Sequence, residues 1–340
     1  MKRFLIIFVL GGLLWGGCKK ENTTPTITGI NGSVNAFAIY NGNLIAAGSF
    51  TKAANVPVNN IAQCNGTAWS NLGGGLTSVV TALATYNGKL IAGCPNLGIY
   101  QWNGSSWTQL SSGYSSFFLF SIYDNNLIVA GTFNSIGGVN AKGLAQWNGI
   151  KWAQVDSNAY SGITSIDTFK GNLIIAGGNL SIGNNTHCGV SQRNGSSWTT
   201  IYNPPPYAYP ALVSPVLYNN KGVLYLGDYL LLATFTSDST GNINILGGVY
   251  NNTSVEIYNF CSYNSKVITF LSSYFLENET GGYYIQQCIG DTLVNLTGTP
   301  NINAMIQYQS NLIIGGNFST VGNTQVMNIA QWNNSTWSPL

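Results

Sequence analysis

Few side chains in this sequence are suited to catalysis. The single histidine, His187, directly precedes Cys188, and a histidine close to a cysteine is the combination that activates a thiol nucleophile. Adjacent residues of an extended strand point to opposite faces, so these two side chains are badly placed to exchange a proton. The sequence therefore predicts no catalytic role for this pair.

The ten acidic residues offer a second kind of chemistry. Glycoside hydrolysis requires two carboxyl groups that face each other across the scissile bond. Asp156 and Asp228 lie near variable loops and are the two acids that we would test for such a role. The acids lack the spacing of a calcium site, and Gly73-Gly74-Gly75 lacks the Lys-Ser/Thr ending of a phosphate-binding loop.

Five cysteines follow Cys18, and their odd number leaves at least one without a disulfide partner: Cys64, Cys94, Cys188, Cys261 and Cys288. Cys64 and Cys288 stand where other copies of a repeated motif carry tryptophan, which indicates buried packing residues. No pair of cysteines has the C-x-x-C spacing of metal ligands. We therefore expect no metal and no other cofactor.

A repeated motif, rather than any catalytic group, dominates the chain. It consists of an apolar strand, Asn-Gly, a tryptophan four residues after the asparagine and an apolar residue three positions later. Clear copies occupy residues 64–72, 102–110, 147–155, 193–201 and 332–340, and two weaker copies begin at Tyr250 and Cys288. Successive asparagine positions are 38 to 57 residues apart, a period that is typical of solenoids and propellers.

One copy illustrates the sheet that the motif predicts. Alternating apolar residues indicate four strands, at residues 80–86, 90–93, 99–102 and 107–110. Asn87-Gly88 favours a two-residue type I′ turn between the first two strands. A two-residue turn at Asn103-Gly104 would place Trp107 diagonally beside Trp102 on one sheet face. We interpret the recurring tryptophans as packing between neighbouring sheets, with platforms for sugars as the alternative.

Four strands in each of seven copies predict an all-β, seven-bladed β-propeller over residues 34–340. The alternative is six blades, if residues 213–300 form one irregular unit. In the sixth copy the first strand is expected at residues 267–274. A further strand at residues 26–30 would lie at the seam where the ring closes.

The second strand of several copies ends in small residues before a phenylalanine, as in Ala47-Gly48-Ser49-Phe50 and Gly315-Gly316-Asn317-Phe318. Together with the later Trp-x-x-Leu strand, this pattern resembles a kelch-type propeller such as the central domain of galactose oxidase. The resemblance covers residues 34–340. It does not extend to the oxidase activity, because the copper site of that enzyme uses two histidines and this chain has one.

Alternating strand directions sort the connections onto two sides of such a propeller. The turns between strands 1 and 2 and between strands 3 and 4 share one side, the turn side. The connections from strand 2 to 3, and from strand 4 to the next copy, share the loop side. The expected strand 2 to 3 loops are residues 51–59, 95–97, 134–142, 179–188, 228–243 and 319–327. Function is expected on the loop side, because variable loops on a rigid scaffold commonly carry binding residues.

Tyrosines mark the most distinctive segment of the loop side. Tyr202, Tyr207 and Tyr209 accompany the stiff run Pro204-Pro205-Pro206. Tyrosine has an apolar body and a polar tip, which suits contact with a carbohydrate or a protein. Two further candidates in other loops are Tyr114 and Tyr160. The alternative is that these tyrosines cover blade edges.

The N-terminus has the features of an export signal. Lys2 and Arg3 precede an apolar stretch at residues 4–15. The sequence Leu14-Trp15-Gly16-Gly17-Cys18 then resembles a bacterial lipobox, although Trp15 departs from its usual aliphatic residue. The resemblance implies a signal peptide at residues 1–17, a lipid on Cys18 and a tether to residue 33. An ordinary secretory signal is the alternative. No aspartate directly follows Cys18, which by resemblance favours the outer membrane.

Charge excludes some partners. Charged residues make up 6% of the chain, and ten basic and ten acidic residues remain after residue 17. With no basic stripe, nucleic acid is not an expected partner. We expect a cell-envelope lipoprotein, held to the membrane by its lipid, whose propeller binds a glycan or a protein without catalysis. The alternatives are a carbohydrate-active hydrolase or epimerase using Asp156 or Asp228, and a structural or adhesion component of an envelope complex.

Overall fold

The computed structural model describes residues 28–169, 171–202 and 301–340. Between these ranges it describes residues 215–218, 221–226, 231–237, 243–249, 254–264, 266–274, 282–287 and 294–296. The regular elements in this part of the chain are β-strands, and no helix in it is long and apolar enough to span a membrane. Cys18 and the preceding segment, with its expected signal and lipid site, lie outside the described residues.

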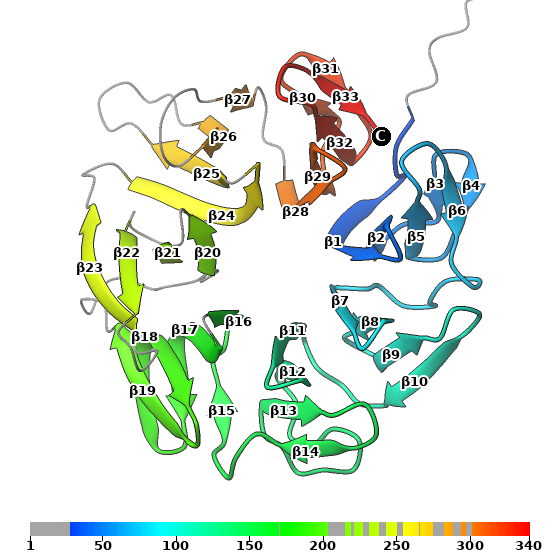
Figure 1. The fold of residues 1–340 in the computed structure, drawn as a ribbon. Coiled ribbons are helices and arrows are strands. Elements are labelled where there is room, and N and C mark those ends of the chain that lie inside the picture. The colour runs from blue at the N-terminus through cyan, green and yellow to red at the C-terminus, as the bar shows by residue number, and fades with distance from the viewer. Residues whose placement is uncertain are drawn as a thin grey trace, which may run out of the picture.

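The described strands form seven antiparallel sheets around a common centre (Figure 1). The first contains β1 (Ser33–Tyr40), β2 (Asn43–Ser49), β5 (Ile61–Cys64) and β6 (Trp69–Asn71). The second contains β7 (Ala82–Tyr86), β8 (Lys89–Cys94), β9 (Gly98–Trp102) and β10 (Trp107–Ser111). The third contains β11 (Phe118–Tyr123), β12 (Asn126–Gly131), β13 (Leu144–Trp147) and β14 (Trp152–Gln154).

The fourth sheet contains β15 (Tyr160–Ser161), β16 (Ser165–Phe169), β17 (Asn172–Ile182), β18 (Asn185–Asn194) and β19 (Ser197–Tyr202). The fifth contains β20 (Pro215–Tyr218), β21 (Lys221–Leu226), β22 (Leu231–Ser237) and β23 (Ile243–Val249). The sixth contains β24 (Ser254–Tyr263), β25 (Lys266–Tyr274), β26 (Gly282–Gln287) and β27 (Val294–Leu296). The seventh contains β28 (Asn301–Tyr308), β29 (Asn311–Asn317), β32 (Ile329–Trp332) and β33 (Trp337–Pro339).

Each sheet turns one strand toward the centre of the ring. These inner strands are neighbours in the order β1, β7, β11, β16, β20, β24 and β28, and β28 lies next to β1 (Figure 1). Radial four-stranded sheets around a common centre are the arrangement of a β-propeller. The all-β, propeller-like fold expected from the repeats is therefore present.

The turns between the first two strands have the expected geometry. Asn41 and Gly42 have φ angles of 49° and 76°, and Asn87 and Gly88 have φ angles of 48° and 69°. Positive φ at both central residues defines the type I′ turn, which matches the twist of the strands that it joins. The prediction made from the Asn-Gly pairs is confirmed at these turns.

The turn after the third strand differs from the prediction. Trp102 pairs directly with Trp107, so the turn between them holds four residues rather than two. The side-chain oxygen of Asn103 accepts hydrogen bonds from the backbone N–H groups of Ser105 and Ser106, at 2.9 Å each. The two indole rings therefore lie opposite each other, with centroids 5.4 Å apart. The same asparagine contacts recur at residues 65, 148 and 333.

Three expectations for the irregular part of the chain and one for the fourth sheet were wrong. The expected loop at residues 228–243 contains β22, the third strand of the fifth sheet. The sixth sheet begins with β24, and the segment at 267–274 belongs to its second strand, β25. Because β24 directly follows the weak motif at Tyr250, that motif does not join strands 3 and 4 of one sheet. The expected loop at 179–188 is largely the paired ends of β17 and β18.

Short hairpins stand on the loop side of the first and seventh sheets. They are β3 (Lys52–Ala53) with β4 (Val56–Pro57), and β30 (Thr320–Val321) with β31 (Thr324–Gln325). The second sheet has no such hairpin, because residues 95–97 suffice to join β8 to β9. The rim of the loop side is therefore low above the second sheet.

The core lies between neighbouring sheets. In β2, Leu44 and Ala46 belong to a buried cluster shared with the seventh sheet, while Ile45 and Ala47 belong to one shared with the second. A strand packed on both faces has no position for a charged side chain. This packing explains why so few residues of the chain are charged.

Candidate functional site

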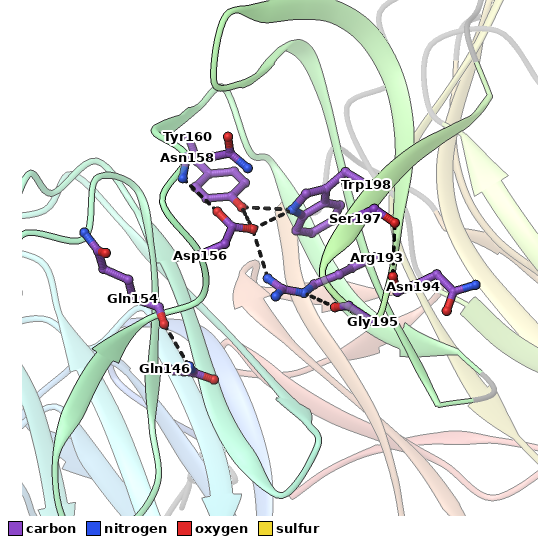
Figure 2. A network of polar contacts seen from close by, with 10 residues as sticks. All are labelled: Gln146, Gln154, Asp156, Asn158, Tyr160, Arg193, Asn194, Gly195, Ser197 and Trp198. Carbon is purple, nitrogen blue, oxygen red and sulfur yellow. Dashed lines mark hydrogen bonds and ion pairs between the residues drawn. The ribbon is translucent and has the colours of Figure 1, made fainter.

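A polar cluster interrupts the apolar packing between the third and fourth sheets (Figure 2). Asp156 follows β14, the outermost strand of the third sheet, and Tyr160 begins β15. Arg193 lies on β18 and Trp198 on β19 of the fourth sheet. The four side chains converge from two sheets, and we call them the Asp156 cluster.

The carboxylate of Asp156 is the centre of this cluster. Its Oδ2 accepts hydrogen bonds from Tyr160 Oη at 2.5 Å and from Trp198 Nε1 at 3.0 Å, and it pairs with Arg193 Nη1 at 3.0 Å. Its Oδ1 accepts the backbone N–H of Asn158 at 2.8 Å. Both oxygens are therefore occupied by donors from the protein.

The neighbours of Asp156 determine its protonation. Burial by itself would raise the pKa of Asp156. The hydrogen bonds from Tyr160, Asn158 and Trp198, together with the charge of Arg193, outweigh burial and hold the pKa below its usual value. Burial and the adjacent carboxylate raise the pKa of Tyr160. An ionised, fully hydrogen-bonded carboxylate is a poor proton acceptor, so this geometry disfavours the alternative that Asp156 acts as a glycosidase residue.

Arg193 occupies a position that holds tryptophan in other copies. It pairs with Trp198 across the sheet, as Trp102 pairs with Trp107 and Trp147 with Trp152. Its Nε donates to the carbonyl of Gly195 at 2.8 Å, and its guanidinium carbon lies 5.9 Å from the centre of the Trp198 ring. The sequence contains the signal for this cluster, because Arg193 replaces the tryptophan of an otherwise intact motif.

Tyr160 is buried and structural rather than exposed. Its side chain is 5% exposed, and its hydroxyl donates to Asp156 and accepts from Trp198 Nε1 at 2.9 Å. Its backbone N–H donates to the carbonyl of Lys142 at 2.9 Å, as that of Leu76 does to Asn59. The position thus anchors the connection onto its sheet. Contact with a ligand through Tyr160 does not fit this burial.

Tyr114 is the exposed tyrosine among the described candidates. The residue is 67% exposed and lies in the connection between the second and third sheets. Val79, 39% exposed, lies in the connection on the other side of the second sheet. Asn96, in the short joint between β8 and β9, and Ser112 are exposed as well. The low part of the loop side therefore presents an uncharged surface that includes an aromatic ring, which we call the low rim.

The other candidates lie partly or wholly outside the described residues. Tyr202 ends β19, and its side chain lies outside the described part. Tyr207, Tyr209 and Asp228 are not among the described residues. His187 pairs with Leu180 across β17 and β18, and the side chains of His187 and Cys188 are outside the description.

The described cysteines behave as core residues. Cys64 and Cys94 are buried, Cys261 is half-buried, and none of the three is in a disulfide. Burial raises the pKa of Cys64, and it raises those of Cys94 and Cys261 to about 12. A protonated thiol is a weak nucleophile. Within the described ranges, no group of three histidine, cysteine or acidic residues could hold a metal ion.

Asp167 is a polar residue of the inner ring that sequence reasoning did not single out. It lies on β16 opposite Ile174, as Ala38 lies opposite Ile45 and Ser121 opposite Ile128. Burial raises its pKa to about 6, against a smaller lowering by the N–H of Thr168. A carboxyl group thus occupies a position that is apolar or neutral in those other two sheets.

Comparison with known proteins concerns the fold. A family described as "Domain of unknown function (DUF5122) beta-propeller" matches residues 124–148, which include β12 and β13. No curated protein matches the sequence. The match is short, and its description as a propeller agrees with the ring of sheets.

The solved structures that match this chain share little sequence with it. The computationally designed Ika8 protein is 12% identical, with a TM-score of 0.51 over 92% of this chain and 87% of that one. YjhT is 16% identical, with a TM-score of 0.45 over 75% and 96%. BBS1N, in its complex with ARL6DN, is 12% identical, with a TM-score of 0.49 over 86% and 91%. At 12% identity, the likeness to the designed Ika8 protein concerns the fold alone.

Proposed function

We propose that this chain is a non-catalytic binding propeller of the kelch type, with seven blades, whose loop side recognises a glycan or a protein. The observation that carries the proposal is Tyr114, a 67% exposed ring on the low rim. Exposed aromatic side chains on a rigid scaffold give contact area at a small cost in conformational entropy. Asn96 and Ser112, which are also exposed on the low rim, add uncharged amide and hydroxyl groups that match a neutral ligand.

We further propose that the protein is a lipoprotein of the bacterial cell envelope, anchored through Cys18 in the outer membrane. Lys2, Arg3 and the apolar segment before Cys18 support this proposal. The first described residues lie against the seventh sheet on the loop side, where Gly29 bridges to Met327. A tether between Cys18 and this point would hold the loop side near the membrane surface.

Binding can be tested by screening the protein against a panel of neutral and acidic glycans. Tyr114→Ala is expected to weaken binding about threefold to tenfold, because an aromatic contact contributes roughly 0.5–1.5 kcal/mol. Ile150→Ala is the matched control, since Ile150 is 85% exposed in a turn of the opposite side. A glycan bound equally by both variants would place the site elsewhere. If no glycan binds, cross-linking in intact envelopes tests the protein partner.

The anchor can be tested separately. Cys18→Ser is expected to remove metabolic incorporation of a labelled fatty acid. A variant that stays lipidated contradicts the lipoprotein proposal without affecting the proposed binding role.

A further inference from the structure

Residues 28–31 close the ring through the same contacts that an internal connection, between β6 and β7, makes with its sheet. Between the first and second sheets, the chain passes from β6 to β7 through Gly75 and Leu76. The N–H of Leu76 donates to the carbonyl of Asn59 at 2.9 Å, and Asn60 Nδ2 donates to the carbonyl of Leu76 at 2.8 Å. These two bonds fasten the connection onto the first sheet.

The same two bonds recur where the first sheet meets the seventh. The N–H of Ile30 donates to the carbonyl of Met327 at 2.9 Å, and Asn328 Nδ2 donates to the carbonyl of Ile30 at 2.8 Å. The asparagines are equivalent in backbone as well, with φ angles of 60° at Asn60 and 59° at Asn328. Ile30 therefore takes on the seventh sheet the place that Leu76 takes on the first.

The glycines before these residues are equivalent too. A Cβ atom on Gly75 would lie 2.3 Å from the carbonyl oxygen of Asn59, and one on Gly29 would lie 2.4 Å from that of Met327. Such close approach of two backbones tolerates glycine alone. The match thus extends over consecutive residues and is not a single coincidental contact.

Further contacts at the seam between the seventh and first sheets have counterparts at the interface between the first and second sheets. Asn303 Nδ2 donates to the carbonyl of Val34 at 3.2 Å, as Asn35 Nδ2 does to Val80. At the outer edge, Trp69 Nε1 donates to the carbonyl of Leu340 at 3.4 Å, and Trp107 Nε1 to that of Leu72 at 3.0 Å. Leu340 and Gly29 therefore correspond to Leu72 and Gly75, the two ends of one connection.

We infer that residues 28–31 are a closing strap that holds the first and seventh sheets together and whose release opens the ring at this seam. The strap differs from its internal counterpart in one respect. The chain joins Leu76 to folded strands on both sides, through β6 and β7. At the seam, the counterparts of Leu72 and Gly75 are Leu340 and Gly29, which lie far apart in the sequence, so no two-residue link joins the strap to the seventh sheet as Gly73-Gly74 joins the internal connection to the first. The strap is therefore held by its contacts, whereas the internal connection is also held by the chain.

This inference is independent of the ligand that the loop side binds. The segment before residue 28 leads directly into the strap. A force on that segment would therefore be transmitted to the ring through the strap. Whatever holds or pulls the N-terminal segment acts first on the seam between the first and seventh sheets.

Hydrogen exchange in two matched variants of the full chain tests the strap. Asn328→Ala and Asn60→Ala each remove an asparagine that bonds the next segment and accepts the N–H of a phenylalanine, Phe318 or Phe50. We expect exchange at the Ile30 amide to accelerate in Asn328→Ala at least tenfold more than exchange at the Leu76 amide in Asn60→Ala. Equal acceleration at the two amides, or more at Leu76, would overturn the inference.

A second pair covers the case in which an asparagine variant does not fold. Gly29→Ala and Gly75→Ala introduce nearly identical clashes with a carbonyl oxygen. The strap can leave its sheet to relieve the clash, so Gly29→Ala is expected to make residues 28–32 cleavable by protease while the thermal midpoint changes little. Gly75→Ala is expected to lower the thermal midpoint by several degrees. Protection of residues 28–32 in Gly29→Ala would contradict the inference.

Discussion

Two interfaces of the ring use the same backbone position in opposite ways. Between the second and third sheets, Trp147 and Trp152 pair with ring centroids 5.2 Å apart, and Trp152 Nε1 donates to the carbonyl of Leu110 at 3.1 Å. Between the third and fourth sheets, Arg193 replaces the first tryptophan, and Trp198 donates instead to Asp156 and Tyr160. The same position of the repeat thus holds either a tryptophan that packs on a second tryptophan or an arginine that pairs with a carboxylate.

The two interfaces differ in whether their buried N–H groups have hydrogen-bond acceptors. In the aromatic version, the Nε1 of Trp147 is buried without a hydrogen-bond partner within the described part of the molecule. In the polar version, the Nε and Nη1 of Arg193 and the Nε1 of Trp198 all have acceptors. The aromatic pair depends on contact area, whereas the members of the Asp156 cluster depend on one another. The two interfaces should therefore respond differently to loss of one member.

The largest effect is expected from Asp156→Ala. This change leaves the guanidinium of Arg193 buried without its partner, and removal of one member of a buried ion pair typically costs about 3 kcal/mol or more. The free energy of unfolding, measured by urea denaturation, should fall by about that amount. Asp124→Asn is the control, because Asp124 lies in a turn where other copies have asparagine, and it should leave the unfolding midpoint unchanged.

A second variant separates the lost ion pair from simple disruption. Arg193→Trp in the Asp156→Ala background recreates the aromatic pair of the other interfaces and removes the unpaired charge. We expect the double variant to recover at least half of the lost stability. A double variant that is less stable than Asp156→Ala would show that position 193 of the fourth sheet cannot accommodate a tryptophan pair.

Much of the fold could be predicted from the sequence because its signals are local. Asn41-Gly42 and Asn87-Gly88 determine their turns through backbone conformation alone, and the strand pattern around them follows. The region from residue 213 to 300 is less predictable, because the motif there is degenerate. The copy at Tyr250 has the spacing of the motif but none of its tryptophans, and its spacing alone predicts the wrong connection.

The site was less predictable because it depends on contacts between sheets. Tyr160 looked like an exposed loop tyrosine, and its burial follows from Asp156 and from β18 and β19. The four-residue turn at Asn103 was missed because the side-chain oxygen of the asparagine, rather than its backbone φ, organises it. Among the copies of the motif, Arg193 differs by placing a basic residue at a tryptophan position.

Substitution of Asp167 is expected to raise the free energy of unfolding, a smaller change than that at Asp156 and of opposite sign. Asp167 has no ionic partner among the described residues. Its folded pKa of about 6 lies above the ordinary value of 3.8, so the folded state binds more protons than the unfolded state between these pH values. Stability should therefore fall as pH rises from about 4 to about 6. Asp167→Asn should remove this fall and stabilise the protein at pH 7 by about 1–2 kcal/mol, allowing for partial exposure.

Urea denaturation of both proteins across pH 4 to 7 measures this effect. The difference in unfolding free energy should be small near pH 4 and should grow as the wild-type carboxyl ionises. Asp156 acts in the opposite direction, since its lowered pKa gives stability that is present above about pH 4 and is lost on further acidification. A constant difference between Asp167→Asn and wild type at all pH values would contradict the assigned ionisation.

The smallest expected effect is the difference in unfolding free energy between variants of Trp152 and Trp198, the two tryptophans that reach across the interfaces. Trp152→Phe and Trp198→Phe remove similar apolar area and one indole N–H each. Trp152 loses a bond to a neutral carbonyl, which contributes about 1 kcal/mol, whereas Trp198 loses a bond to a carboxylate, for which about 1.5–3 kcal/mol is typical. Trp198→Phe should therefore lower the unfolding free energy by about 1 kcal/mol more. Equal losses would mean that Tyr160 and Arg193 satisfy Asp156 without the indole, and that the polar interface is less interdependent than its geometry indicates.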